Sequence, residues 1–369
     1  MINIEIGIVG LPESGKTTVF NTLTAGKADT VHHAPEGAKP HVGVTKVPEP
    51  RLAALKDLLH PKKVVPVEIG YVDIGASVKG LAKDKGIGGE LLNRLSTVDA
   101  LINVVRTFPD ESIPHIEGSL DVNRDIDTMD LELAFSDLAI IERRLERIQV
   151  SLKAAKPSER QGFLHGQETL LKFKSDLEKE VPIRELRLSP GEARMVANYQ
   201  FLTAKPLLIA VNIGEGQLSE IESLEAELNS KHARPKLRAI VLCGELEMEL
   251  AQLEESAREE FRAEFSIKEY APERIIKLSY ELLGLVSFFT TVHDEVRTWS
   301  IPGGTTALKA ASKTHTDMER GFIRAEVTTY DDLLKCGSIA EARKKGLLRL
   351  EGKDYIVQDG DVITFLFNV

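Results

Sequence analysis

One short segment constrains this chain more than any other. Residues 10–17 read Gly-Leu-Pro-Glu-Ser-Gly-Lys-Thr, between an apolar run at 4–9 and the helix-compatible segment TTVFNTLTAG. A G-x-x-x-x-G-K-[ST] loop in this context is typical of P-loop proteins, whose backbone amides surround phosphate oxygens. The sequence therefore predicts a nucleotide-phosphate site in which Lys16 binds the phosphates and Thr17 binds Mg²⁺. A chance match on a polar turn is the alternative.

A second predicted metal ligand is Asp73, which ends the apolar run EIGYVD. A carboxylate at the end of a buried strand helps to hold the metal in P-loop enzymes. We therefore predict that Thr17 and Asp73 together hold Mg²⁺, with a strand-end or helix-capping aspartate as the alternative. In the D-x-x-G pattern the glycine amide senses the γ-phosphate, and Ala76 stands at that position here. Alanine lacks the conformational freedom that glycine has.

The base-recognition motif departs from the guanine-specific pattern. GTPase-like folds use N-K-x-D after a later strand, whereas this chain has Asn212-Ile213-Gly214-Glu215 after LLIAV. The longer carboxylate of Glu215 weakens guanine selectivity, and Ile213 offers an apolar surface on which any purine can lie. An ordinary strand-to-helix turn is the alternative. The residues predicted to bind the nucleotide are Gly10, Pro12, Glu13, Ser14, Gly15, Lys16, Thr17, Thr18, Asn212, Ile213, Glu215, Cys243 and Gly244.

The wider hydrophobic pattern predicts the fold class. Helix-compatible stretches separate short apolar runs at 4–9, 67–72, 100–105, 207–211 and 239–242. Alternation of this kind predicts an α/β fold with a mostly parallel sheet covered by helices, which is the P-loop NTPase architecture.

Two helical seams, which are rows of apolar residues along one side of a predicted helix, interrupt this alternation between about 128 and 202. Apolar residues recur at spacings of three and four over 131–152, ending near Pro157, and again over 163–177, ending before Pro182. Each seam needs a partner and the connection is short, so we expect an inserted hairpin of two antiparallel helices. An extended coiled-coil dimer is the alternative.

The hydrophobic pattern changes again from about residue 284. Short alternating runs are separated by Gly and Asp-Gly pairs, with one helical piece near 338–345, which predicts a small mixed β domain. The predicted division has three domains: a P-loop nucleotide-binding domain at 1–127 and 203–283, a helical hairpin at 128–202, and a β domain at 284–369.

Composition excludes several classes of protein. The 369 residues carry 47 Lys+Arg against 57 Asp+Glu, and this net charge of -10 leaves only local patches for binding nucleic acid. The longest apolar run, 206–211, is far shorter than the ~20 residues of a membrane span. No export signal is visible. Cys243 and Cys336 lack the spacing of a metal site or a disulfide framework. We therefore expect a cytoplasmic protein with no membrane partner.

The carboxyl-terminal part carries the most specific resemblance to a known family. His315-Thr316-Asp317, GFIRAEV at 321–327 and LEGKDYIVQDGD at 350–361 resemble the TGS domain, a β-grasp module, of the YchF family of Obg-like ATPases. With the motifs above, the similarity covers essentially the whole chain. The resemblance implies a helical insertion in the nucleotide domain, slow hydrolysis of ATP in preference to GTP through an N-x-x-E motif, and association with ribosomes. Asn212 and Glu215 match that motif.

The resemblance also implies a catalytic histidine. The family has one in the loop after the strand that ends VVR, and His115 falls at this place. A neutral imidazole there could orient or deprotonate the attacking water. A solvent-exposed loop histidine is the alternative. The predicted catalytic residues are therefore Lys16 and His115.

Four positions depart from the family pattern. Glu13 stands where asparagine is usual, Gly37 replaces the switch threonine, Ala76 replaces the glycine discussed above, and Ser77 replaces a hydrophobic residue. These changes fall on the parts that sense the γ-phosphate and the metal. We therefore expect these changes to lower the rate of hydrolysis more than they lower the affinity for a nucleoside diphosphate.

A basic run on the predicted helical arms suggests a surface for partners: Arg143, Arg144, Arg147, Lys153, Lys156 and Arg160. One reading is a solvated face paired with Glu142 and Glu146, and the other is contact with the phosphates of ribosomal RNA. We expect a monomeric, Mg²⁺-dependent nucleoside triphosphatase that prefers ATP to GTP and works as a slow switch at the ribosome. A nucleotide-binding adaptor with little hydrolysis and a conventional GTPase are the alternatives.

Overall fold

The computed structural model describes residues 4–25, 40–73, 87–110, 112–264, 269–292 and 294–368. Gly37, Ala76 and Ser77, which the sequence singles out, lie outside these ranges. The chain divides into two compact units. Of the described residues, those within Ile4–Val44 and Gly70–Leu278 form one unit, and those within Thr45–Ile69 and Ser279–Val369 form the other.

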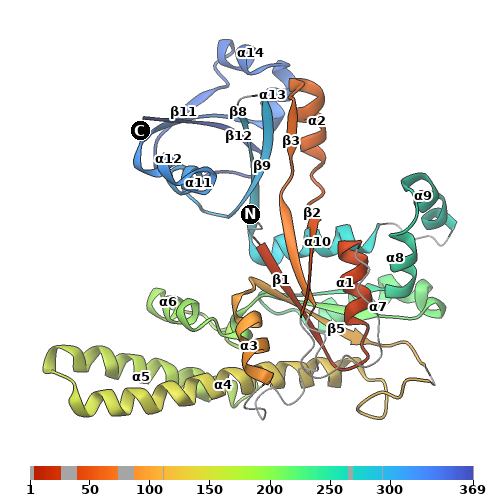
Figure 1. The fold of residues 1–369 in the computed structure, drawn as a ribbon, viewed down its shortest axis with the longest axis vertical. Helices are drawn as coiled ribbons and strands as arrows, with labels where there is room; N and C mark the ends of the chain where they lie inside the picture. The colour runs from red at the N-terminus through yellow and green to blue at the C-terminus, as the bar shows by residue number, and fades with distance from the viewer. Residues whose placement is uncertain are drawn as a thin grey trace. The chain divides into compact units, whose positions relative to one another are not determined.

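A six-stranded sheet organises the larger unit, and its central strands are parallel (Figure 1). Every residue of the neighbouring strands β5 and β6 is buried, as expected where helices cover both faces. The α/β fold and the apolar strands read from the sequence are therefore confirmed. In spatial order the strands are β2 (His41–Lys46), β4 (Glu68–Asp73), β1 (Ile4–Gly10), β5 (Ala100–Arg106), β6 (Leu207–Asn212) and β7 (Leu237–Leu242).

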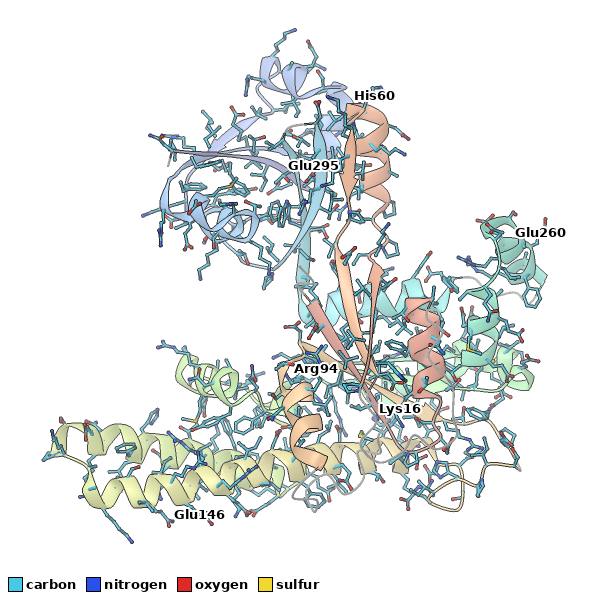
Figure 2. All side chains as sticks on the ribbon, in the orientation of Figure 1. Lys16, His60, Arg94, Glu146, Glu260 and Glu295 are labelled. Carbon is cyan, nitrogen blue, oxygen red and sulfur yellow. The ribbon has the colours of Figure 1, made fainter. Side chains whose placement is uncertain are left out.

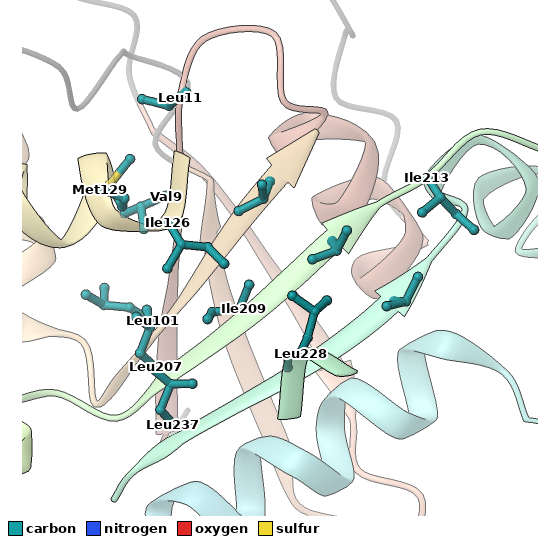
Figure 3. Packing of buried hydrophobic residues seen from close by; sticks show 14 of the residues in the cluster. Val9, Leu11, Leu101, Ile126, Met129, Leu207, Ile209, Ile213, Leu228 and Leu237 are labelled. Atoms are coloured by element: carbon teal, nitrogen blue, oxygen red, sulfur yellow. The ribbon is translucent and has the colours of Figure 1, made fainter. Parts of the chain in front are cut away.

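The core of this unit lies between the sheet and its helices. Figure 3 shows Leu101 and Ile209 from the strands packed with Ile126 and Met129 of α4 (Val122–Ala154) and Leu228 of α7 (Ile221–Lys231). The first turns of α4 are thus fixed against the sheet. Further helices follow the strands: α1 (Lys16–Thr24), α3 (Ile87–Thr97), η3 (Glu215–Glu220), α8 (Gly244–Leu250), α9 (Glu255–Glu264) and α10 (Ala271–Leu283).

The helical hairpin predicted between 128 and 202 is present. Helix α4 packs against α5 (Pro157–Leu177) through the two apolar seams, and Figure 1 shows the two lying side by side. The seams are filled within one chain, so no second copy is needed to cover them. Pro157 occupies the first turn of α5, where proline fits best. The hairpin ends in η1 (Ile183–Glu185), α6 (Pro190–Tyr199) and η2 (Leu202–Ala204).

A buried carboxylate fastens the base of the hairpin to the chain that returns to the sheet. Asp137 of α4 is fully buried and accepts hydrogen bonds from the Leu202 and Thr203 amides and from the Thr203 hydroxyl. Burial raises the pKa of Asp137 to about 6, although these donors oppose the shift. Asp137 therefore has a structural role.

The smaller unit contains a second six-stranded sheet of mixed direction, as predicted for the residues after 284. The helical piece expected near 338–345 is α14 (Ile339–Lys344). In spatial order the strands are β11 (Arg349–Glu351), β10 (Phe322–Thr329), β12 (Asp361–Phe367), β8 (Leu285–Val292), β9 (Glu295–Pro302) and β3 (Lys63–Val65). The other helices are α2 (Pro50–Leu59), α11 (Ala307–Thr314), α12 (Thr316–Arg320) and α13 (Tyr330–Cys336).

Residues 45–69 belong to this smaller unit although they lie early in the chain. Leu52 and Leu55 of α2 pack with Phe289, and β3 pairs in parallel with β9. Arg51 forms a 2.7 Å ion pair with Asp359. The three-domain division suggested by the sequence places this segment with the nucleotide-binding part, and that division stays a prediction. Among the helices that the structure describes, none is long and apolar enough to cross a membrane.

Candidate nucleotide-binding site

The loop at 10–17 joins β1 to α1 with a backbone that only glycine allows at two positions. Gly10 and Gly15 have φ angles of 155° and 91°. A Cβ at Gly10 would lie 2.5 Å from the Val104 carbonyl oxygen, and one at Gly15 would lie 2.3 Å from Asn212 Nδ2. No side chain caps the start of α1. Its first amides are therefore available to an anion.

Lys16, labelled in Figure 2, lies at the start of α1. Its Nζ donates to the Gly10 and Leu11 carbonyl oxygens at 3.3 Å and 2.9 Å, and the residue is 7% exposed. Burial lowers the pKa of Lys16 to about 8, while the charges of Asp73 and Glu13 oppose that shift. A buried ammonium with only carbonyl partners is well suited to a bound polyphosphate.

The remaining loop residues surround this position. Ser14 is 2% exposed, and its Oγ has no hydrogen-bond partner. Pro12, Glu13 and Thr18 are half-buried. Glu13 adopts a left-handed φ of 59°, which costs a residue with a side chain about 1 kcal/mol. Its carboxylate is close enough to Lys16 to influence the ammonium.

The structure brings together the two residues predicted to hold the metal. The Thr17 hydroxyl donates to Asp73 Oδ2 at 2.7 Å, and Asp73 is fully buried. The other carboxylate oxygen, Oδ1, is buried without a hydrogen-bond partner. His41 Nδ1 lies 3.7 Å from Oδ2, a neighbour that the sequence did not reveal.

This oxygen-rich arrangement fits Mg²⁺, which prefers one or two protein oxygens together with phosphates and water. The unpartnered Asp73 Oδ1 and the lone pairs of the Thr17 hydroxyl are suitable ligands. Among the residues that the structure describes, no cluster of three or more His, Cys, Asp or Glu forms a protein-only metal site.

Asn212 connects the phosphate loop to the loop after β7. Its Nδ2 donates to the Ser14 carbonyl oxygen at 3.2 Å, and its Oδ1 accepts from the Gly244 amide at 2.9 Å. The side chain is 4% exposed, so these bonds are shielded from water. Asn212 therefore positions two segments that are far apart in the sequence, in addition to any contact with a base.

Ile213 does not lie where the sequence analysis expected it. The residue is 2% exposed and belongs to the hydrophobic core, as Figure 3 shows. The prediction that it offers an apolar surface to a purine is therefore wrong. Alternate residues of a strand share one face, and Leu207, Ile209, Val211 and Ile213 all face this core. That parity was the signal available in the sequence.

The other predicted base contacts differ in exposure. Glu215 is exposed at the start of η3, whereas Cys243 is 3% exposed, and burial raises the pKa of its thiol. A cavity of about 950 Å³ opens beside both residues. Its other lining residues are Gly216, Leu218, Ser219, Ile221, Glu222, Glu225, Ala226, Asn229, Val241, Leu242, Leu246, Glu247, Glu269 and Arg274.

His115 is not the exposed loop histidine of the alternative reading. Its side chain is 5% exposed, and Nε2 lies 3.0 Å from Oδ2 of Asp125 in the first turn of α4. The Glu117 amide donates to Nδ1 at 3.2 Å. The ring is thus hydrogen-bonded at Nδ1 and lies close to a buried carboxylate at Nε2, and its predicted catalytic role requires it to leave this position.

Comparison with known proteins agrees with this geometry. The family model MMR_HSR1, a 50S ribosome-binding GTPase, matches residues 5–138, and the model YchF-GTPase_C, described as a protein of unknown function, matches 285–368. A "Ribosome-binding ATPase YchF" of Bacillus subtilis is 40% identical over 99% of this chain and all of its own length. This chain belongs to the YchF family. The Escherichia coli O157:H7 YchF is 35% identical over the full length of both chains.

The comparison with solved structures finds a match over nearly the whole chain. The solved structure of the Schizosaccharomyces pombe YchF GTPase matches with a TM-score of 0.81 at 28% identity, covering 99% of this chain and 98% of that one. The P-loop architecture expected from the resemblance is therefore confirmed for this YchF family member.

Proposed function

We propose that this protein is a Mg²⁺-dependent nucleoside triphosphatase that binds ATP in preference to GTP and hydrolyses it slowly at the ribosome. The observation that carries the proposal is the loop at 10–17, in which Lys16 and the free amides of α1 converge beside the Thr17–Asp73 pair. The printed names of its relatives, ribosome-binding ATPases, support the reaction and the partner.

The chain's own groups explain how the triphosphate is held. The loop amides and Lys16 bind its oxygens and neutralise their charge, which is the main contribution that proteins make to phosphoryl transfer. Thr17 and Asp73 are the residues that hold Mg²⁺, and the ion adds positive charge beside the phosphates when it is bound. His115 is the group that orients the attacking water once its ring is free.

Recognition of the base rests on Asn212 and Glu215. Asn212 fixes the loops that flank the base, and the exposed carboxylate of Glu215 accepts hydrogen bonds from amino groups of a purine. Cys243 and Gly244 complete this side of the site. The replacement of the guanine-specific N-K-x-D pattern supports ATP as the preferred nucleotide.

The helical hairpin supplies the surface that we propose for ribosomal RNA. In the described part of the chain, none of the six basic residues of the run forms an ion pair with a carboxylate, and Glu142 pairs with Lys174 instead. Unpaired cations remain free to bind RNA phosphates, and their affinity falls steeply with salt. This surface supports a cytoplasmic, ribosome-associated protein, and we propose that it acts as a monomer.

A nucleotide-binding adaptor with little hydrolysis is the second candidate, favoured by the buried His115 side chain, whose Nδ1 is occupied by the Glu117 amide. Single-turnover cleavage of γ-labelled ATP by excess protein separates the two functions. Release of labelled phosphate that requires Mg²⁺ and is lost in Lys16→Ala supports the enzyme. ATP that binds and stays intact supports the adaptor.

A further inference from the structure

The loop that carries His115 is fastened to the first turn of α4. Asp125 in that turn is 2% exposed, and its Oδ2 lies 3.0 Å from His115 Nε2. On the opposite side of the ring, Nδ1 accepts the Glu117 amide hydrogen. The imidazole is therefore enclosed between a buried carboxylate and the backbone of its own loop.

Together with the burial of the side chain, these two neighbours keep both ring nitrogens away from water. A neutral imidazole has one N–H and one lone pair, and its tautomer is assigned from its partners. The Glu117 amide occupies the Nδ1 lone pair, so the hydrogen of a neutral ring is on Nε2, which lies 3.0 Å from Asp125 Oδ2 without forming a hydrogen bond to it. Water has no basic nitrogen to bind while this contact holds.

Asp125 itself is held rigidly. Its Oδ1 accepts from Nε and a terminal nitrogen of Arg124 at 3.0 Å and 2.8 Å. Arg124 also donates to the hydroxyl and the carbonyl of Ser119, and so ties the loop to the helix a second time. The next residue, Ile126, packs into the core of the sheet. Only a movement of the loop or of this turn can therefore open the contact.

We propose that Asp125 is a positioning residue that withholds His115 from the nucleotide until the contact with the first turn of α4 opens. This inference rests on the proposed role of His115 in hydrolysis. Because α4 continues into the hairpin, the same helix that presents the basic run also sets the availability of the histidine. The arrangement keeps hydrolysis slow in the free protein.

The Asp125→Asn variant tests the proposal with little change of shape. Its amide can present N–H groups to Nε2 in place of a carboxylate, which removes the attraction that holds the ring. We expect kcat for ATP to rise about threefold or more, with KM within about twofold of the parent value. The increase should be absent when Asp125→Asn is combined with His115→Ala. A kcat that is unchanged or lower in Asp125→Asn overturns the proposal.

Asp121→Ala is the matched control. Asp121 caps α4 through the Asn123 and Arg124 amides and does not contact His115, so its loss weakens the same turn without touching the ring. We expect no increase in kcat. An increase equal to that of Asp125→Asn would assign the effect to general loosening of α4 and overturn the specific role of Asp125.

The ¹⁵N shifts of His115 in the wild-type protein provide a measurement independent of hydrolysis. The structure requires hydrogen on Nε2 and none on Nδ1, and the opposite tautomer overturns the withheld state. If this tautomer is found but His115→Ala hydrolyses ATP at the wild-type rate, the catalytic role of His115 fails. If neither the wild type nor Asp125→Asn hydrolyses ATP, the proposed enzyme fails too. The outcomes therefore separate the two proposals.

Discussion

The Thr17 hydroxyl donates its hydrogen to the Asp73 carboxylate at 2.7 Å, across 56 residues of sequence. This bond uses the hydrogen of the hydroxyl and leaves its lone pairs available, while Asp73 keeps one buried oxygen without a partner. This hydrogen bond holds the end of β4 next to the start of α1. Both groups therefore keep oxygen lone pairs that a cation can use.

Thr17→Ala should remove most of the benefit that Mg²⁺ brings to ATP binding. The variant loses one oxygen and the bond that orients Asp73, so we expect Mg²⁺ to tighten ATP about tenfold less than in the wild type, about 1.4 kcal/mol. Calorimetric titration with and without Mg²⁺ measures this. Thr17→Ser keeps the hydroxyl and should behave as the wild type. Equal Mg²⁺ dependence in Thr17→Ala would contradict the assignment.

Gly15→Ala should disrupt the loop. A methyl group at φ 91° is strained and lies 2.3 Å from the Asn212 amide nitrogen. The Asn212 side chain, which joins the phosphate loop to the loop after β7, must therefore move. We expect a loss of roughly 1–3 kcal/mol of stability and at least about a tenfold loss of ATP affinity. Gly216→Ala is the control because its Cβ meets open space. Thermal unfolding measures the stability of both variants, and calorimetric titration measures their affinity for ATP.

Glu215→Asp should shift nucleotide preference. The shorter side chain restores the acid of the guanine-specific motif at an exposed position beside the cavity. We expect the ratio of ATP to GTP affinity to fall about tenfold, since hydrogen-bond reach at one base edge is worth about 1–3 kcal/mol. Competition between the two labelled nucleotides measures the ratio, with Glu220→Asp as the control. An unchanged ratio would remove Glu215 from base recognition.

Glu247→Gln should stabilise the protein above neutral pH. Burial raises the pKa of Glu247 from 4.5 to about 7, so the folded state retains a proton that the unfolded state releases. Stability contributed by this group therefore falls as pH rises from about 4.5 to about 7. We expect the variant to gain about 1–3 kcal/mol at pH 8 and nothing below pH 4.5. Denaturant unfolding measures this, with exposed Glu249→Gln as the control. A gain that does not depend on pH would show another cause.

The site was predictable where its chemistry is local. The phosphate loop is one continuous segment, and its glycines and Lys16 can be read without a structure because strand, loop and helix are adjacent. Asp73 was predictable because it ends a buried strand. The tie between Asn212 and Ser14 joins residues 198 positions apart, and no pattern within either segment reveals it.

The sequence was misleading where two explanations competed for one residue. Its position in the base-recognition motif suggested that Ile213 contacts a purine, but the alternation of side chains along its strand places it in the core. The three-residue strand β3 gives no periodic signal, so its parallel pairing with β9 could not be foreseen. The contact between His115 and Asp125 depends on how a loop folds onto a helix, which spacing does not specify.

The affinity of Lys16→Ala for ATP tests the central claim most directly. If the amides of residues 10–17 and the Lys16 ammonium bind the triphosphate, calorimetry at pH 7 should show ATP binding at least about tenfold weaker in this variant. Lys231→Ala, an exposed lysine on α7, should bind as the wild type does. ATP affinity that is the same in Lys16→Ala and in the wild type would contradict the account.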